Sequence, residues 1–111
     1  MEFFDYNFFM NYFKEKDVKK IKSYKFDFIE LDETDFVFTV TLNRPKKKNA
    51  LHPQMINEIA FAFQYAFYNN NVRAVLLKSN GDVFCSGLDL KAVAGNVEKN
   101  NSTVPKPSSK I

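Results

Sequence analysis

Hydrophobic and polar positions alternate along residues 24–42, which predicts two β-strands. The alternation begins at Tyr24 and changes phase at Ile29, so the first strand should carry a local irregularity. A polar turn is expected at residues 32–35, and the second strand should follow it. One face of that strand carries Phe36, Phe38, Val40 and Leu42. The two runs are therefore expected to pair as an antiparallel hairpin.

A helical period replaces this alternation after Pro53, a residue that is well tolerated in the first turn of a helix. Apolar residues then recur at spacings of three and four as far as Tyr68, which predicts an amphipathic helix. The short apolar run 72–77 reads as a parallel strand buried on both faces. Strand, helix and strand form a right-handed crossover unit, so the fold class is α/β.

The two ends of the chain lack these periods. Residues 1–22 form an aromatic-rich and charged N-terminal extension, in which one aromatic stripe has helical spacing: Phe4, Phe8, Phe9, Tyr12 and Phe13. Packing of this stripe against the domain and disorder both remain open. Residues 96–111 are polar and contain proline, which predicts a flexible tail. The folded domain is accordingly placed at residues 23–95.

Composition limits the functional classes. A chain of 111 residues with 45% hydrophobic and 26% charged residues can form one small globular domain. The net charge of +3 is spread among acidic residues, which argues against nucleic-acid binding. The single cysteine, Cys85, excludes an internal disulfide and fits a reducing compartment. No run predicts a transmembrane segment, a secretory signal or a metal site, so the cytoplasm is expected.

Candidate chemistry centres on residues 83–91, where an apolar strand end reaches Gly87 and a helix is expected to open at Leu88. The first N–H groups of such a helix have no intrahelical partner and can receive an anion. A glycine that serves only the turn is the simpler interpretation. Cys85 reads as a small apolar residue. His52 is the only histidine, and the pattern favours a pre-helix residue over a general base.

A second motif changes this interpretation. Residues 43–51 read Asn-Arg-Pro-Lys-Lys-Lys-Asn-Ala-Leu, and together with Phe-Cys-Ser-Gly-Leu-Asp-Leu-Lys at 84–91 they resemble the enoyl-CoA hydratase/isomerase, or crotonase, family. The resemblance runs from about Tyr24 to Ala92. Family chains are far longer, so it implies an N-terminal portion of a crotonase-type fold: a β-hairpin, a helix, a parallel strand and a short helix.

The resemblance implies an acyl-CoA thioester as the substrate, with coenzyme A as part of it and no covalently bound cofactor. Two main-chain N–H groups stabilise the enolate oxygen in this family, and the motif assigns one of them to Leu88. Lys46 or Lys48 should contact the phosphates of coenzyme A, and Arg44 should tie the loop down. Asp89 is expected to cap the turn rather than to take a proton. The positions matched to the coenzyme A pocket are Ala50, Ser86, Gly87, Asp89, Leu90 and Lys91.

The family pattern places the second N–H donor and the proton-moving carboxylates beyond Ile111. The chain is therefore expected to be an N-terminal fragment of a lyase or isomerase of fatty acid metabolism, inactive alone, with a homo-trimer or hexamer forming only in a full-length protein. An alternative is a non-catalytic module that binds coenzyme A or docks on a partner. A generic small α/β domain with a fortuitous motif is a third interpretation.

Overall fold

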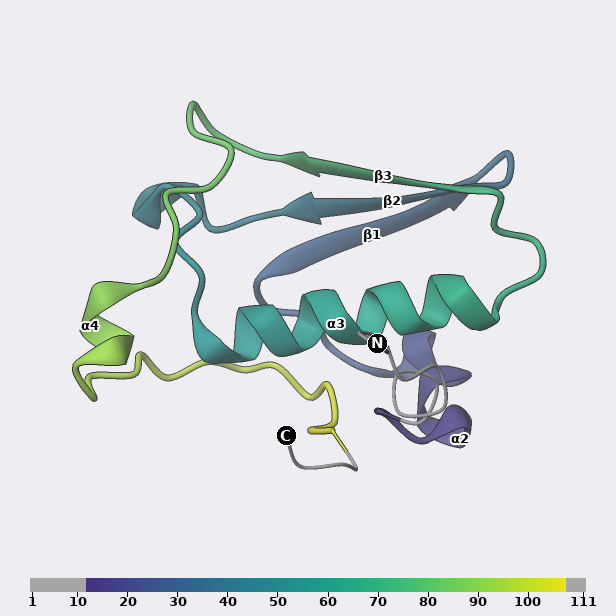
Figure 1. The fold of residues 1–111 in the computed structure, drawn as a ribbon, viewed down its shortest axis with the longest axis horizontal. Helices are drawn as coiled ribbons and strands as arrows, with labels where there is room; N and C mark the ends of the chain where they lie inside the picture. The colour runs from purple at the N-terminus through teal and green to yellow at the C-terminus, as the bar shows by residue number, and fades with distance from the viewer. Residues whose placement is uncertain (1–11, 108–111) are drawn as a thin grey trace, which may run out of the picture.

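The computed structural model describes residues 12–107, which form a small α/β structure around a three-stranded sheet (Figure 1). The strands are β1 (Ile29–Thr34), β2 (Val37–Leu42) and β3 (Ala74–Ser79), in the order β1-β2-β3. β1 and β2 pair antiparallel, which confirms the predicted hairpin. β3 pairs parallel to β2, as a strand–helix–strand crossover requires.

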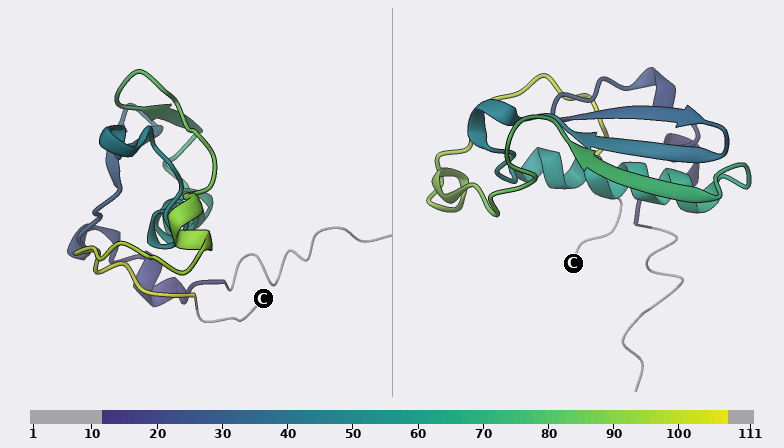
Figure 2. Two further views of the ribbon diagram at one scale, coloured as in Figure 1. Left: turned by 90° about the vertical axis from the view of Figure 1, so that its left-hand side faces the viewer. Right: turned by 90° about the horizontal axis from the view of Figure 1, so that it is seen from above.

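The crossover helix α3 (Pro53–Tyr68) lies between the sheet and a second layer (Figures 1 and 2). That layer contains α2 (Glu15–Val18), the 3-10 turn η1 (Ile21–Ser23) and the C-terminal segment. Two further short helices, η2 (Pro45–Lys47) and α4 (Leu90–Val93), lie in the loops that follow β2 and β3. Within residues 12–107, no helix is both long and apolar enough to cross a membrane.

The core is packed against both sides of α3. Phe38, Val40 and Leu42 of β2 are buried on the sheet side. On the other side the ring of Phe61 packs edge-on against that of Phe13, with centroids 5.0 Å apart. Of the predicted aromatic stripe, Tyr12 and Phe13 are described, and Phe13 is buried. The other members of the stripe, Phe4, Phe8 and Phe9, lie outside the described residues.

The hairpin is shifted relative to its prediction. β1 begins at Ile29 instead of Tyr24, because the aromatic rings of Tyr24 and Phe26 pack against Phe61 from an irregular segment. The turn is not at residues 32–35 but at Asp35 and Phe36, whose φ angles are 52° and 67°. A two-residue turn with positive φ angles matches the twist of the paired strands, so residues 32–34 continue the pairing.

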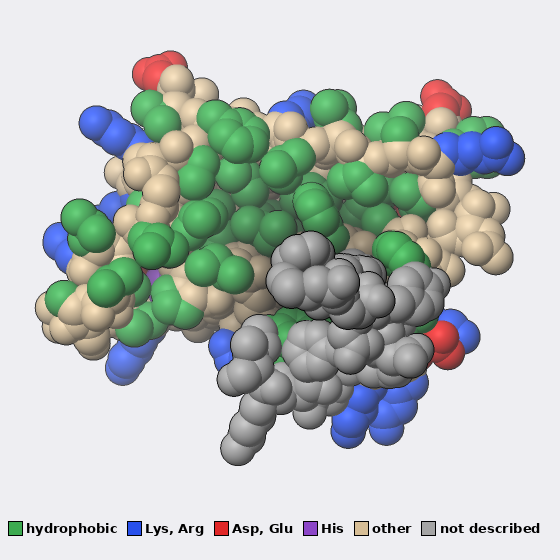
Figure 3. All heavy atoms as spheres, in the orientation of Figure 1, with side chains coloured by type: hydrophobic (Ala, Val, Ile, Leu, Met, Phe, Trp, Pro, Cys, Tyr) green, Lys and Arg blue, Asp and Glu red, His purple; other side chains and the backbone are tan. Residues whose placement is uncertain are grey.

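The burial predicted for β3 is wrong. Its apolar side chains Val75, Leu76 and Leu77 are 42%, 51% and 39% exposed. β3 is an edge strand of this sheet, so one of its sides has no neighbour within the described residues. Figure 3 shows the result as hydrophobic side chains gathered on the face that β3 and α3 share.

The segment 96–107 runs in extended form along α3 instead of leaving the domain as a free tail. Val104 is buried, and the side chain of Gln54 donates hydrogen bonds to Ser102 Oγ and to the carbonyl oxygen of Val104. Thr103 pairs with Lys25 through two hydrogen bonds, one from each main-chain N–H group. These partners are distant in sequence, which is why the local pattern gave no sign of them.

Candidate functional site

Asn49 joins the loop after β2 to the loop after β3. Lys48 and Asn49 have positive φ angles of 52° and 55°, a conformation in which asparagine is favoured among the residues other than glycine. The buried Asn49 side chain accepts a hydrogen bond from the N–H of Arg44 at 2.7 Å. Its amide nitrogen donates to the carbonyl oxygens of Asn80 and Val83. One side chain therefore fixes both motif-bearing loops.

The two motifs then meet main chain to main chain. Leu51 and Leu88 form a parallel bridge, in which the N–H of Leu51 donates to Gly87 O at 2.8 Å and the N–H of Asp89 donates to Leu51 O at 3.1 Å. Ser86 N–H adds a hydrogen bond to the carbonyl oxygen of Lys48. The two motifs that carry the family resemblance, at residues 43–51 and 84–91, are thus in direct contact in space.

The amide of Leu88 is left available by this pairing. Hydrogen-bonding groups alternate sides along an extended chain, so the groups of Gly87 and Asp89 that bond Leu51 leave the N–H of Leu88 directed away from it. No described group accepts a hydrogen bond from that N–H. The Leu88 side chain is 59% exposed.

The helix predicted to open at Leu88 begins two residues later. α4 starts at Leu90, and Asp89 caps it by accepting hydrogen bonds from the N–H groups of Lys91 and Ala92. This confirms the capping role predicted for Asp89. The amide of Leu88 is accordingly free because of its extended pairing, not because it belongs to the first turn of a helix. Gly87 has a φ angle of 98°, so this position needs glycine for its backbone conformation.

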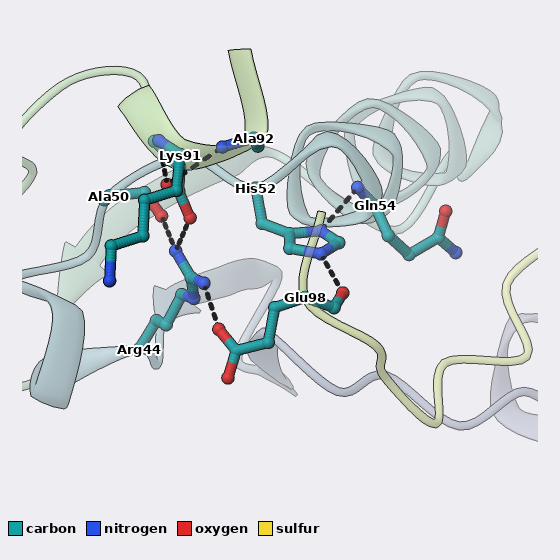
Figure 4. Close-up of polar contacts among 8 residues, drawn as sticks. Arg44, Ala50, His52, Gln54, Lys91, Ala92 and Glu98 are labelled. Atoms are coloured by element: carbon teal, nitrogen blue, oxygen red, sulfur yellow. Dashed lines mark hydrogen bonds and ion pairs between the residues drawn. The ribbon is translucent and has the colours of Figure 1, made fainter. Parts of the chain in front are cut away.

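Arg44 ties this arrangement together, as the sequence predicted. Its guanidinium donates to Asp89 Oδ2 at 2.9 Å and to the carbonyl oxygen of Ala50 at 3.0 Å (Figure 4). The hydrogen bond from Arg44 holds the pKa of the Asp89 carboxyl below its usual range. Asp89 is therefore a carboxylate committed to structure and poorly suited to accept a proton.

A hollow of about 530 Å³ lies beside these residues. Four of the predicted pocket residues, Ala50, Asp89, Leu90 and Lys91, line it together with the predicted donor Leu88. Ser86 and Gly87 bond the main chain of Lys48 and Leu51 and are not among the lining residues. Of the three consecutive lysines, Lys47 lines the hollow, whereas Lys46 and Lys48 do not. Within residues 12–107, neither Lys47 nor Lys91 has an acidic partner at ion-pair distance.

His52 and Cys85 take no part in the hollow. His52 is buried at the N-cap of α3, where Nδ1 accepts from the N–H of Gln54 and Nε2 donates to the carbonyl oxygen of Glu98 at 2.6 Å. Both ring nitrogens are engaged, so the predicted pre-helix role is confirmed. Cys85 packs at the edge of the core, but Phe84 beside it is 52% exposed and follows β3 in a loop, not at a buried strand end.

Four residues at the site escaped the sequence prediction: Asn96, Glu98, Lys47 and Asn49. Asn96 and Glu98 line the hollow from a segment without periodicity, so no pattern pointed to them. Lys47 could not be separated from its two neighbours, because the short turn η2 decides which lysine faces the hollow. Asn49 did carry a signal, since asparagine between a short turn and an apolar residue is typical of a left-handed position.

Comparisons with known proteins agree on one family. The family model for enoyl-CoA hydratase/isomerase matches residues 32–110. A probable enoyl-CoA hydratase of Mycobacterium leprae is 40% identical over 70 residues, which cover 63% of this chain and 27% of that protein. The 3-hydroxyisobutyryl-CoA hydrolase 1 of Arabidopsis thaliana is 37% identical over 71 residues, which cover 64% of this chain and 19% of the hydrolase.

The fold leads to the same group of proteins. The crystal structure of enoyl-CoA hydratase from Mycobacterium tuberculosis superposes with a TM-score of 0.61 and 36% identity, covering 65% of this chain and 33% of that one. The described fold is therefore a partial crotonase-type fold, and the chain spans about a quarter of the length of the first Mycobacterium relative. The paired loops, the shared profile and the common fold together place this chain in the enoyl-CoA hydratase/isomerase family.

Proposed function

We propose that this chain supplies one half of an acyl-CoA site, in which the main-chain N–H of Leu88 donates a hydrogen bond to the thioester oxygen. The observation that carries the proposal is the available Leu88 amide beside a lined hollow, held there by the pairing with Leu51. The relatives named above act, by their names, on enoyl-CoA and 3-hydroxyisobutyryl-CoA.

The lysines around the hollow support a phosphate-bearing ligand. Lys47 and Lys91 line it, and Lys46 and Lys48 flank Lys47 on the same exposed turn. An ammonium on a flexible stem suits a phosphate, so we assign the phosphates of coenzyme A to this turn, with Lys46 or Lys48 able to reach them beside Lys47. Ser86, Gly87 and Asp89 shape the loop that holds the thioester end.

The proposed half-site lacks chemistry of its own. A single donor leaves an oxyanion incompletely stabilised, and removal of one such donor typically costs about 3 kcal/mol. Asp89, the acid nearest to Leu88 in sequence, is committed to Arg44 and to the cap of α4. The 111-residue chain should therefore bind a thioester without turning it over. The second donor and the acid–base groups would come from the part of the fold that the longer relatives contain.

The test is a titration of the 111-residue chain with an enoyl-CoA, followed by calorimetry for binding and by absorbance of the conjugated thioester for turnover. Binding without turnover is the expected result. Turnover would refute the assignment of an incomplete site, and the absence of binding would refute the acyl-CoA site itself.

Two substitutions at one position isolate the amide. Leu88→Pro removes the N–H, whereas Leu88→Ala shortens the side chain and keeps the donor. Leu88→Pro should weaken thioester binding about tenfold, the equivalent of one lost hydrogen bond, while Leu88→Ala should bind as the wild type does. Circular dichroism of both variants checks that the fold is kept. Equal affinities in the two folded variants would contradict the role of the amide.

For a full-length protein of this kind we propose a cytoplasmic lyase or isomerase of fatty acid metabolism that assembles as a homo-trimer or hexamer. The second candidate function is a non-catalytic docking module, and a specific observation favours it. The face shared by α3 and β3 exposes apolar side chains that an isolated chain would present to partners. The thioester titration separates the two functions, because the acyl-CoA half-site predicts binding and a docking module does not.

A further inference from the structure

The guanidinium of Arg44 is buried and bonds residues that line the hollow, although Arg44 itself does not line it. The residue is 8% exposed, and its guanidinium carbon lies 5.8 Å from the centre of the Phe28 ring. Three acceptors surround it: the carbonyl oxygen of Ala50, Asp89 Oδ2 and Glu98 Oε2, the last at 2.7 Å from Nη2 (Figure 4). A buried charge with this set of partners is costly to form and costly to disturb.

One nitrogen of the Arg44 side chain bonds a residue of each motif. Nη1 bonds the carbonyl of Ala50, which directly precedes Leu51, and the carboxylate of Asp89, which directly follows Leu88. The other oxygen of Asp89 is fixed by the N–H groups at the start of α4. The peptide of Leu88 is therefore held between a bridge on one side and a carboxylate anchored at both oxygens on the other.

We infer that Arg44 is a positioning residue, which sets the direction of the Leu88 N–H through Ala50 and Asp89. The inference rests on the proposed function for what that amide binds, but the orientation itself can be measured without any ligand. Arg44 also holds a third residue that lines the hollow. Nη2 holds the carboxylate of Glu98, whose carbonyl accepts from His52.

Lysine cannot replace this arginine. The planar guanidinium reaches three acceptors in fixed directions, whereas an ammonium is a compact charge on a flexible stem. Arg44→Lys therefore keeps the charge between Asp89 and Glu98 but loses the planar set of N–H donors. Arg44→Gln also removes the charge and leaves two carboxylates facing a neutral amide.

The matched control is Arg73→Gln. Arg73 also stacks on a phenylalanine, with its guanidinium carbon 5.7 Å from the centre of the Phe36 ring, but it precedes β3, at the opposite end of that strand from the loop that carries residues 84–91. It has no polar contact with Ala50, Asp89 or Glu98 among the described residues. Arg73 is exposed, so this variant reports the effect of losing an arginine charge and its ring contact away from the site.

The experiment records amide resonances of the full 111-residue chain by heteronuclear NMR, without ligand and then with an acyl-CoA. We expect Arg44→Gln and Asp89→Asn to shift the Leu88 amide proton in the same direction, Arg44→Lys to shift it less, and Arg73→Gln to leave it unchanged. Thioester affinity should fall about tenfold in Arg44→Gln and remain near the wild-type value in Arg73→Gln.

An unchanged Leu88 resonance in a folded Arg44→Lys or Asp89→Asn variant would overturn the positioning role. The use of these milder variants keeps the test decisive if Arg44→Gln does not fold. If the wild-type chain binds no thioester but the Leu88 amide moves as expected, the positioning role stands and the proposed function fails. If the thioester binds and the Leu88 amide does not move, the proposed function stands and the positioning role fails.

Discussion

Glu58 is fully buried on α3, and its two carboxylate oxygens accept the main-chain N–H groups of Asp27 and Phe28 at 2.7 and 2.8 Å. These amides lie in the irregular segment before β1, where the strand ladder has not yet begun. The side chain of Gln54 donates to the carbonyl oxygen of Val104, and that of Asn49 donates to the carbonyl oxygens of Asn80 and Val83. Single buried polar side chains thus replace secondary structure as the partners of main-chain groups.

Burial raises the pKa of the Glu58 carboxyl above its ordinary value of 4.5, against the opposing effect of the amide hydrogen bonds. Because the folded pKa exceeds the unfolded one, the stabilisation is fully present at pH values below the unfolded pKa and is lost as pH rises through the folded pKa. Glu58→Gln removes this titration. The free energy of unfolding of the variant should therefore increase relative to that of the wild type as pH rises.

Urea unfolding midpoints measured between about pH 4 and pH 7 test this expectation. Glu15→Gln is the control, because Glu15 is an exposed glutamate paired with Lys19 on the surface of α2. A stability difference between Glu58→Gln and the wild type that stays constant with pH would contradict the raised pKa.

At the scale of elements, the periods in the sequence predicted the hairpin, α3 and the parallel pairing of β3, because each leaves a repeated pattern of apolar residues. The same patterns gave wrong boundaries where tertiary contacts decide. Tyr24 and Phe26 alternate like a strand but pack on Phe61 from an irregular segment. At the site, the motifs located Leu88 and Asp89, whereas Glu98 depends on a contact with Arg44 from 54 residues away.

The docked C-terminal segment offers a direct test at this scale. Val104 is 4% exposed and Val97, in the same segment, is 51% exposed. Val104→Ala should lower the free energy of unfolding by about 2 kcal/mol, because two buried carbon groups are lost and a small cavity remains. Val97→Ala should change it by less than about 0.5 kcal/mol. Chemical denaturation measures both.

Equal effects of the two substitutions would show that the segment does not pack in solution as the structure describes. Hydrogen exchange gives an independent measure, since the N–H of Thr103 donates to the carbonyl oxygen of Lys25 and should exchange slowly.

At the scale of the whole molecule, one face is apolar and exposed. Phe63 and Phe67 on α3 and Val75 on β3 line a surface hollow of about 330 Å³, and all three are more than a third exposed. Figure 3 shows hydrophobic side chains continuing across this face. A monomer rarely presents so continuous an apolar surface to water. The isolated 111-residue chain should therefore associate with itself.

Light scattering after size exclusion should give a mass above that of one 12.9 kDa chain, rising with protein concentration. Phe67→Ser should lower this mass toward the monomer. Val93→Ser is the control, because Val93 is 68% exposed on α4 and does not line this hollow. A concentration-independent monomer in the wild type would contradict the expectation.

The pairing of Thr103 with Lys25 joins residues that are 78 positions apart, and Asn101 reaches Asp27 across 74. Contacts of such long range form slowly, because a large loop must close before they contribute. On a ribosome, the hairpin and α3 can assemble while residues 101–107 are still inside the exit tunnel. The segment that covers Gln54 and Glu58 can dock only after synthesis has passed it, so these buried polar groups stay hydrated until the end of folding.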